Sequence, residues 1–229
     1  MGAVGEAILN YLAHNPESCF LLSEVNRANL EQLETVQNIV VVGSSCVGKT
    51  TKVAHLRDVF QGSSKVKVAQ RYITRPQRLN DDVIENKFVT AEEFDEHIAQ
   101  GIINFSWSRK MEGTRVERYG FSIIQNKLTV LSGNNALYAN RESIAPAGIL
   151  EKDTLWIGVY APDVVRIDRM MRRSPDLSEE EMRYRLGDSG ELVKPEVHLI
   201  LRNYDYEMKR SSKDFEDLVN VILEAKKES

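Results

Sequence analysis

The chain has 229 residues, of which 42% are hydrophobic and 28% charged, and its formal net charge is −4. These values are ordinary for a globular protein, and the negative balance argues against a nucleic-acid surface. No apolar run is long enough to cross a membrane, and no N-terminal segment has the pattern of a signal peptide. Only two cysteines, Cys19 and Cys46, are present, which favours a reducing compartment. We therefore expect a cytoplasmic protein that binds neither nucleic acid nor a membrane.

Residues 1–36 come before the first strong strand pattern. Val4, Ile8 and Leu12 have helical spacing, and Leu30 and Leu33 repeat this spacing further on. We predict a helical N-terminal extension that packs either on the core or on a second subunit, and the second outcome would make a homodimer. Residues 37–229 are expected to form one domain.

From residue 37 onward, apolar runs typical of buried strands alternate with helical patterns. The expected strands are Ile39–Val42, Val66–Ala69, Leu128–Leu131, Leu155–Tyr160 and Val197–Leu201. The expected helices are Thr51–Phe60, Ala91–Gln100, Asp163–Arg172, Ser178–Leu186 and Asp214–Lys226. This alternation predicts an α/β fold with a doubly wound, mostly parallel sheet, in which ligands bind at the carboxyl ends of the strands. The polar and charged run at 108–119 predicts an exposed loop.

The segment from Gly43 to Thr50 has the P-loop pattern, and it lies between an expected strand and an expected helix, which argues against a purely structural turn. Its glycines let consecutive backbone N–H groups point at one anion, and the helix N-terminus adds positive charge there. Lys49 can reach the terminal phosphates, and the Thr50 hydroxyl can bind Mg²⁺. We therefore predict that ATP and Mg²⁺ bind here. The predicted nucleotide-binding residues of this segment are Gly43, Ser44, Ser45, Cys46, Val47, Gly48, Lys49, Thr50 and Thr51.

Three arginines lie within eight residues directly after the second expected strand. They are Arg71, Arg75 and Arg78, and Pro76 stiffens the turn between the last two. Forked guanidinium groups suit bidentate binding of phosphate oxygens. A solvated basic patch is the alternative, but the cluster follows a strand, on the sheet edge where the P-loop also belongs. The sequence therefore predicts two neighbouring anion pockets, one for a donor and one for an acceptor that already carries a phosphate.

From about residue 37 to the C-terminus, the chain resembles the guanylate-kinase-like family of P-loop kinases. The matching segments besides the P-loop are Thr74-Arg75-Pro76 with Arg78, Lys87-Phe88-Val89, Tyr119-Gly120, Arg172 or Arg173, Ser178-Glu179-Glu180 with Arg185-Leu186, and Asn203. The resemblance implies a small acceptor-binding subdomain at about residues 72–120 and an arginine-bearing lid at about residues 172–190.

The resemblance also implies roles for single residues. The family binds the acceptor's phosphate with arginines and a tyrosine of its small subdomain, brings lid arginines to the transferring phosphoryl group, and places a late asparagine near the adenine. The residues so implied are Arg75, Arg78 and Tyr119 for the acceptor, Arg172, Arg173 and Arg185 with Lys49 for catalysis, and Asn203 for the nucleotide.

Three acceptor positions depart from the guanylate kinase pattern. Arg71 stands where the family has a guanine-reading serine, Asn86 falls near its phosphate-binding tyrosine, and Ser106 falls near its guanine-reading glutamate. We include all three in the predicted acceptor site. An acceptor with two phosphates and no base offers negative charge where guanine offers hydrogen bonds, and a third guanidinium suits that charge.

The family's acidic motif after the central strand is replaced here by Ser132-Gly133-Asn134-Asn135. Thr50 is therefore the one predicted Mg²⁺ ligand. The candidates for a second ligand are Asp81, Asp82 and Glu85.

The segments Arg71–Pro76 and Phe105–Trp107 are similar to the ribose 1,5-bisphosphate phosphokinase branch of the family. This resemblance implies an ATP-dependent kinase that transfers the γ-phosphoryl group to a small phosphorylated acceptor. Ribose 1,5-bisphosphate is the first expectation, and guanylate or another nucleoside monophosphate is the second. A binding scaffold without catalysis and a nucleotide hydrolase stay open as alternatives. The intact Lys49 and Thr50 argue against the scaffold, and the lack of a second acidic strand motif argues against the hydrolase.

Overall fold

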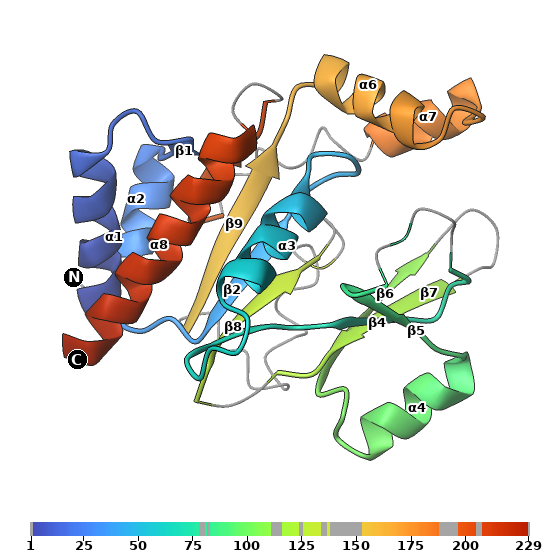
Figure 1. The fold of residues 1–229 in the computed structure, drawn as a ribbon, viewed down its shortest axis with the longest axis horizontal. Helices are drawn as coiled ribbons and strands as arrows, with labels where there is room; N and C mark the ends of the chain where they lie inside the picture. Colours follow the sequence, from blue (N-terminus) through green and yellow to red (C-terminus); the bar gives the residue numbers. More distant parts are fainter. Residues whose placement is uncertain are drawn as a thin grey trace.

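The structure is a computed structural model, and it describes residues 2–77, 81, 83–110, 116–123, 126–133, 137, 153–187, 197–204 and 208–228. In this part of the chain, a six-stranded sheet with helices forms the larger part of the molecule. A four-stranded sheet with one helix forms the smaller part (Figure 1). None of the described helices is both long enough and apolar enough to span a membrane.

The large sheet is mostly parallel. Its strand order is β1-β10-β9-β2-β8-β3, and every neighbouring pair is parallel except β1 with β10. These strands are β1 (Phe20–Leu21), β2 (Asn38–Val42), β3 (Val66–Val68), β8 (Leu128–Ser132), β9 (Thr154–Tyr160) and β10 (Leu199–Arg202). The predicted α/β fold with a mostly parallel sheet is confirmed.

Strand β2 lies inside this sheet and is buried on both of its faces. Ile39 and Val41 pack into one buried cluster, whereas Val40 and Val42 pack into another. Because both faces are covered, the strand reads in the sequence as a continuous apolar run and not as an alternation.

Several helices pack against the large sheet, whereas α4 (Ala91–Ala99) lies beside the small one (Figure 1). The other described helices are α1 (Ala3–His14), α2 (Glu24–Glu31), α3 (Lys49–Val59), α6 (Asp163–Arg173), α7 (Glu179–Gly187) and α8 (Met208–Glu228). Leu56 of α3 and Phe215 of α8 are fully buried in the same cluster as Ile39 and Val41. Figure 1 shows α1 and α2 beside α8, at the end of the molecule where both chain termini lie.

The N-terminal segment packs on the core of its own chain. Val4 and Ile8 of α1 and Leu30 of α2 are buried in the cluster that holds the residues of β2. Of the two outcomes that the sequence left open, packing on the core is the observed one. The segment also adds β1 to the edge of the large sheet. This strand was not predicted, because two residues are too few to leave a periodic pattern.

The small sheet has the strand order β5-β4-β7-β6. Its strands are β4 (Arg71–Ile73), β5 (Asn86–Phe88), β6 (Phe105–Lys110) and β7 (Val116–Phe121). The predicted exposed loop at 108–119 is wrong for residues 108–110 and 116–119, which belong to the paired strands β6 and β7. Polarity did not mark a loop here, because an antiparallel strand keeps polar residues on a solvated face. Residues 111–115 lie outside the described part.

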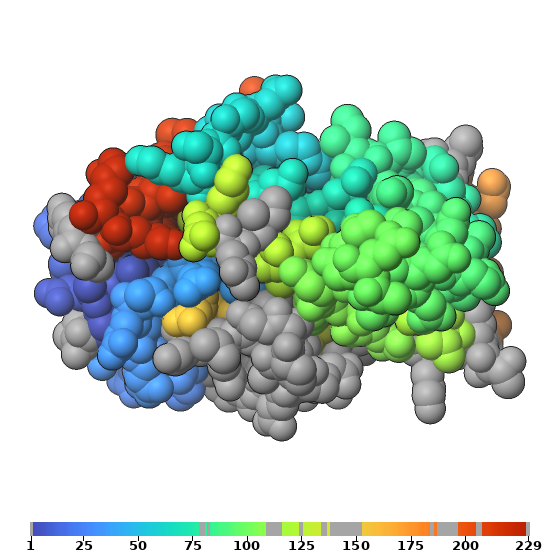
Figure 2. All heavy atoms as spheres, turned by 90° about the horizontal axis from the view of Figure 1, so that it is seen from below, coloured from blue at the N-terminus to red at the C-terminus, as the bar shows by residue number. Residues whose placement is uncertain are grey.

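Aromatic side chains fill the space between the two sheets. The rings of Phe105, Trp107, Tyr119 and Phe121 stack on the small sheet, with 5.2 Å between the ring centroids of Trp107 and Tyr119. These residues share a buried cluster with Val42 of β2. Figure 2 shows the small sheet and α4 as a lobe at one end of the molecule, with α8 at the other end.

A buried lysine joins α3 to α8. The Lys52 side chain is fully buried, and its Nζ donates to the Met208 carbonyl oxygen at 2.7 Å and to Ser212 Oγ at 3.0 Å. Burial, assisted by the positive charge of Arg169, lowers the pKa of Lys52 from 10.5 to about 8. The unfolded chain therefore keeps the Lys52 proton to a higher pH than the folded protein does.

The Lys52→Met variant is expected to reveal this difference as a pH dependence of stability. Between about pH 8 and 10 the unfolded state binds more protons, so the free energy of unfolding of the wild type should rise relative to that of the variant, by about 2 to 3 kcal/mol in total. Urea unfolding of both proteins at several pH values between 7 and 10 measures it. Parallel curves for the two proteins would contradict the shifted pKa.

Candidate active site

Strand β2 leads into the turn at residues 43–48, and α3 follows directly. Two residues of this turn, Cys46 and Gly48, have left-handed φ values of 63° and 96°. A Cβ atom at Gly48 would lie 2.1 Å from Asn203 Nδ2, so the turn leaves no room for a side chain there. The structure thus has the strand, tight turn and helix that the P-loop pattern predicts.

Lys49 lies over this turn. Its Nζ donates to the carbonyl oxygens of Gly43 at 2.5 Å and Ser44 at 2.7 Å. Thr50 and Thr51 are exposed in the first turn of α3. A helix N-terminus, a mobile ammonium group and an exposed hydroxyl are the parts that a triphosphate and its Mg²⁺ need. The geometry fits the predicted ATP site, with Thr50 as the hydroxyl that would hold the metal.

Two arginines of α6 support the turn from behind, and the sequence analysis did not single them out. Arg166 is fully buried, and its Nε donates to the Ser45 carbonyl oxygen at 3.1 Å. Arg169 donates to the carbonyl oxygens of Cys46 and Val47, both at 3.2 Å. Their spacing of three residues, which puts both on one face of the helix, was the signal available in the sequence.

Asn203 also lies directly behind the turn. It is fully buried, its Nδ2 donates to the Val47 carbonyl oxygen at 2.6 Å, and its Oδ1 accepts from Ser211 Oγ at 3.2 Å. Arg169 donates to its carbonyl oxygen at 2.9 Å. The observed contacts make Asn203 a support of the P-loop, while its contact with adenine stays a prediction.

Arg71 connects the small sheet to the large one. Its Nε and one terminal nitrogen donate to Asn86 Oδ1 at 3.0 and 2.7 Å, and its other terminal nitrogen donates to the Ser132 carbonyl oxygen at 3.2 Å. Ser132 ends β8 and is the register partner of Val41 on β2, two residues before the P-loop. The structure therefore brings Arg71 and Asn86 to the P-loop edge of the large sheet.

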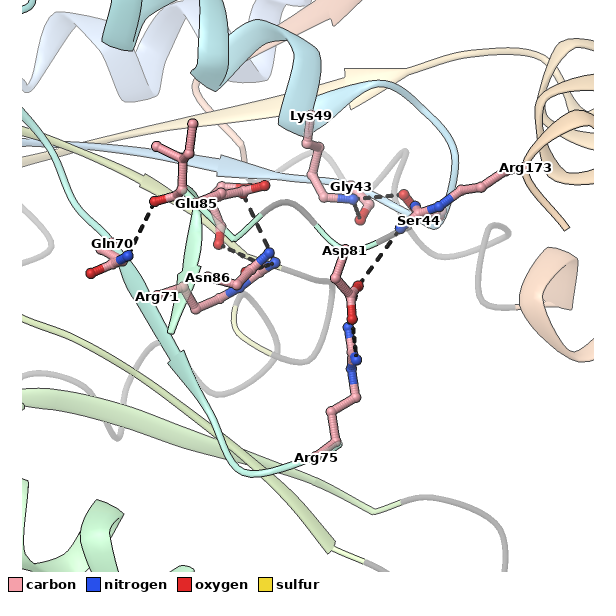
Figure 3. A network of polar contacts seen from close by, with 12 residues as sticks. Gly43, Ser44, Lys49, Gln70, Arg71, Arg75, Asp81, Glu85, Asn86 and Arg173 are labelled. Atoms are coloured by element: carbon pink, nitrogen blue, oxygen red, sulfur yellow. Dashed lines mark hydrogen bonds and ion pairs between the residues drawn. The ribbon is translucent and has the colours of Figure 1, made fainter. Parts of the chain in front are cut away.

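Arg75 is held by a carboxylate that the sequence analysis considered only as a metal ligand. Its two terminal nitrogens bond to the two oxygens of Asp81 at 2.6 and 2.7 Å. Arg173 of α6 approaches the same carboxylate, at 3.8 Å from Asp81 Oδ1. Figure 3 shows Asp81 between Arg75 and Arg173, with Lys49 in the same close-up. Arg78 lies outside the described residues.

Of the other predicted lid arginines, Arg172 faces away from this centre. The Arg172 side chain is 76% exposed and pairs with Asp168 of its own helix at 2.8 Å. Arg185 belongs to α7, but its side chain lies outside the described part of the structure. Of the two neighbours that the resemblance left open, Arg173 is the one that approaches Asp81, the carboxylate bonded to Arg75.

Tyr119 and Ser106 lie on opposite faces of the small sheet. Tyr119 is buried, and its hydroxyl donates to the carboxylate of Glu117, which is itself buried. Ser106 is exposed, and its neighbour Trp107 is the residue that stacks on Tyr119. Because successive strand residues face opposite sides, the structure does not bring Ser106 together with the other predicted acceptor residues.

Comparisons with known proteins bear on this arrangement. No family model matches the chain. The ribose 1,5-bisphosphate phosphokinase PhnN of Thiobacillus denitrificans is 26% identical over 168 residues, which are 73% of this chain and 84% of that protein. The crystal structure of guanylate kinase from Anaplasma phagocytophilum superposes with a TM-score of 0.50 at 17% identity, over 85% of this chain and 88% of that one.

The chain has the guanylate-kinase-like P-loop fold. The predicted resemblance is thereby confirmed, and both proteins named above are kinases, which supports the predicted enzyme class. A gluconokinase from Sinorhizobium meliloti 1021 also superposes, over 80% of this chain and 94% of that one at 11% identity. Its TM-score of 0.42 is too low to support a conclusion about this chain.

In this guanylate-kinase-like fold, a second Mg²⁺ ligand is not identified. Of the three candidates, Asp81 is bonded to an arginine, Glu85 is buried 3.9 Å from an arginine, and Asp82 lies outside the described residues. Across the described ranges, no group of three His, Cys, Asp or Glu side chains could hold a metal ion. Thr50 stays the predicted ligand.

Removal of the Arg173 guanidinium is expected to lower the activity more than removal of the Arg172 guanidinium. If Arg173 has its predicted catalytic role, Arg173→Gln should lower kcat for kinase turnover at least about 100-fold, because positive charge on the transferring phosphoryl group is lost. Arg172→Gln should have a much smaller effect, because that side chain faces solvent. Steady-state ADP formation compares the two variants, and a larger loss in Arg172→Gln would reverse the assignment.

Proposed function

We propose that the protein is an ATP-dependent phosphotransferase that moves the γ-phosphoryl group of ATP to a small acceptor that already carries phosphate. The observation that carries this proposal is the convergence of cations from four elements. Lys49 comes from the P-loop helix, Arg71 from β4, Arg75 from the segment after β4, and Arg173 from α6. Such a set suits two phosphate-bearing substrates that meet end to end.

The proposed mechanism divides the charges between donor and acceptor. The turn amides and Lys49 bind the β- and γ-phosphates of ATP, and the Thr50 hydroxyl holds Mg²⁺. Arg71 and Arg75 bind a phosphate of the acceptor, which places its nucleophilic oxygen in line with the γ-phosphorus. Arg173 neutralises charge on the phosphoryl group as it transfers. Phosphoryl transfer needs positioning and charge stabilisation more than covalent help from the protein.

We propose ribose 1,5-bisphosphate as the favoured acceptor, with a nucleoside monophosphate as the second. Two features support an acceptor that carries no nucleobase. The inner face of the small sheet is filled by packed aromatic rings such as Trp107, and the carboxylate on this face, Glu117, is bonded to Tyr119. Arg71 adds a further guanidinium, which suits the second phosphate of such an acceptor. The relative named for ribose 1,5-bisphosphate agrees with this choice.

A screen of acceptors tests the proposal. Purified protein with ATP and Mg²⁺ is assayed for ADP release with ribose 1,5-bisphosphate, other sugar phosphates, GMP and other nucleoside monophosphates. We expect release that depends on ribose 1,5-bisphosphate. Fast turnover with GMP alone would replace the acceptor by guanylate. Release without any acceptor would indicate a hydrolase, and no release with any acceptor would indicate a binding scaffold.

A further inference from the structure

The guanidinium of Arg75 already binds an anion, and that anion is part of the protein. Both oxygens of Asp81 contact its two terminal nitrogens, at 2.6 and 2.7 Å. The pair is withdrawn from water, since the side chains of Arg75 and Asp81 are 10% and 3% exposed. The Phe88 ring covers the guanidinium, with 5.4 Å between Arg75 Cζ and the ring centroid. Arg75 is therefore held as a fork that faces a pair of oxygens.

A phosphate would contact the same fork in the same way. Two oxygens of a carboxylate and two oxygens of a phosphate both match the parallel N–H groups of a guanidinium. One fork cannot serve both anions through the same two nitrogens. If Arg75 binds the acceptor's phosphate, as proposed above, Asp81 has to give up at least one of its two bonds first.

A second cation lies within reach of Asp81. Arg173 of α6 is 3.8 Å from the oxygen that also contacts Arg75, and its side chain is half-exposed, so it can move closer. The same helix supports the P-loop turn through Arg166 and Arg169. Asp81 therefore lies between Arg75, the arginine proposed to bind the acceptor, and α6, the helix that contacts the P-loop.

We propose that Asp81 is a built-in substitute for the acceptor's phosphate. It binds Arg75 until the acceptor's phosphate displaces it, and it then stays close to Arg173 of α6 without taking over that guanidinium. Arg75 thus stays correctly oriented without substrate. This inference rests on the proposed function in one respect, namely that the ligand of Arg75 is a phosphate.

The Asp81→Asn variant tests the competition directly. The amide keeps the size of the carboxylate but loses its charge, so phosphate should replace it more easily. Isothermal calorimetry with inorganic phosphate, without ATP, is expected to show about tenfold tighter binding than in the wild type. Because the P-loop also binds phosphate, the comparison is repeated with Arg75→Gln in both proteins, where the difference should disappear. Unchanged or weaker binding in Asp81→Asn would overturn the proposal.

Stability supplies a second measurement and a matched control. Loss of the Asp81 charge leaves Arg75 buried without its partner, which destabilises the fold. Phosphate should therefore raise the melting temperature of Asp81→Asn more than that of the wild type, or refold the variant if it is unfolded. Asp168→Asn removes an equally close arginine partner from the exposed face of α6 and should not change the response to phosphate. A variant that phosphate neither stabilises nor refolds also overturns the proposal.

These measurements use neither ATP nor turnover, so they separate this inference from the proposed function. Tighter phosphate binding in Asp81→Asn together with a failed acceptor screen would keep the role of Asp81 and remove the kinase assignment. Acceptor-dependent ADP release together with unchanged phosphate binding would keep the kinase and remove the role of Asp81.

Discussion

Lys49→Ala is expected to abolish measurable transfer of phosphoryl groups, a loss of at least about 100-fold in kcat. The ammonium lies over the P-loop turn, bonded to the carbonyl oxygens of Gly43 and Ser44, and a nucleotide phosphate offers it a stronger, charged acceptor. Without it, the γ-phosphate loses both a positional contact and neutralising charge. The measurement is ADP formation with saturating ATP and the best acceptor from the screen.

The matched control is Lys67→Ala. Lys67 is an exposed lysine on β3, so its removal changes the net charge by the same amount without touching the P-loop. Its activity should stay within about twofold of the wild type, and its melting temperature should stay close to that of the wild type, since substitutions of exposed residues usually change stability little. Near-normal turnover in Lys49→Ala would exclude the P-loop mechanism.

Gly48→Ala is expected to damage both the fold and the nucleotide site. The residue has φ of +96°, and an added Cβ would lie 2.1 Å from Asn203 Nδ2. That nitrogen bonds the Val47 carbonyl oxygen, so the clash disturbs the support of the whole turn. Backbone strain and overpacking together should lower the free energy of unfolding by about 3 kcal/mol or more. Urea unfolding and a nucleotide-binding titration measure the two losses.

Two other glycines separate the clash from the backbone strain. Gly62 and Gly101 have φ of +76° and +69°, but an added Cβ at either would meet nothing within 4 Å. Gly62→Ala and Gly101→Ala should therefore cost only the left-handed backbone term, about 1 to 2 kcal/mol, and leave nucleotide binding intact. If Gly48→Ala behaves like these controls, the tight contact with Asn203 is not important.

Local patterns predicted much of this molecule correctly. The buried parallel strands each left an apolar run, and β2, β8 and β9 lie within a residue or two of their predicted positions. The P-loop could be placed because its requirements are local: a strand, a tight turn that needs glycine, and a helix start. Helix α4 begins with a local signal of the same kind, a capping box formed by Thr90 and Glu93.

The errors and omissions share one cause. The predicted loop is wrong for residues 108–110 and 116–119, because their charges hide the alternation and only the pairing of β6 with β7 shows that these residues form strands. Arg166 and Arg169 look in the sequence like surface residues of a polar helix. Their contacts with the P-loop carbonyls depend on where α6 packs, which no local pattern specifies.

The sequence by itself determined the order of the buried parallel strands of the large sheet, the P-loop and the presence of an arginine cluster after the second of these strands, because each follows from neighbours along the chain. Only the tertiary structure decided which arginines meet. Arg173 and not Arg172 faces the centre, Ser106 faces away from it, and Asp81 binds Arg75 instead of standing alone as a candidate metal ligand. Side-chain direction and charge pairing are set by how the two sheets and α6 pack together, over contacts between residues far apart in the chain.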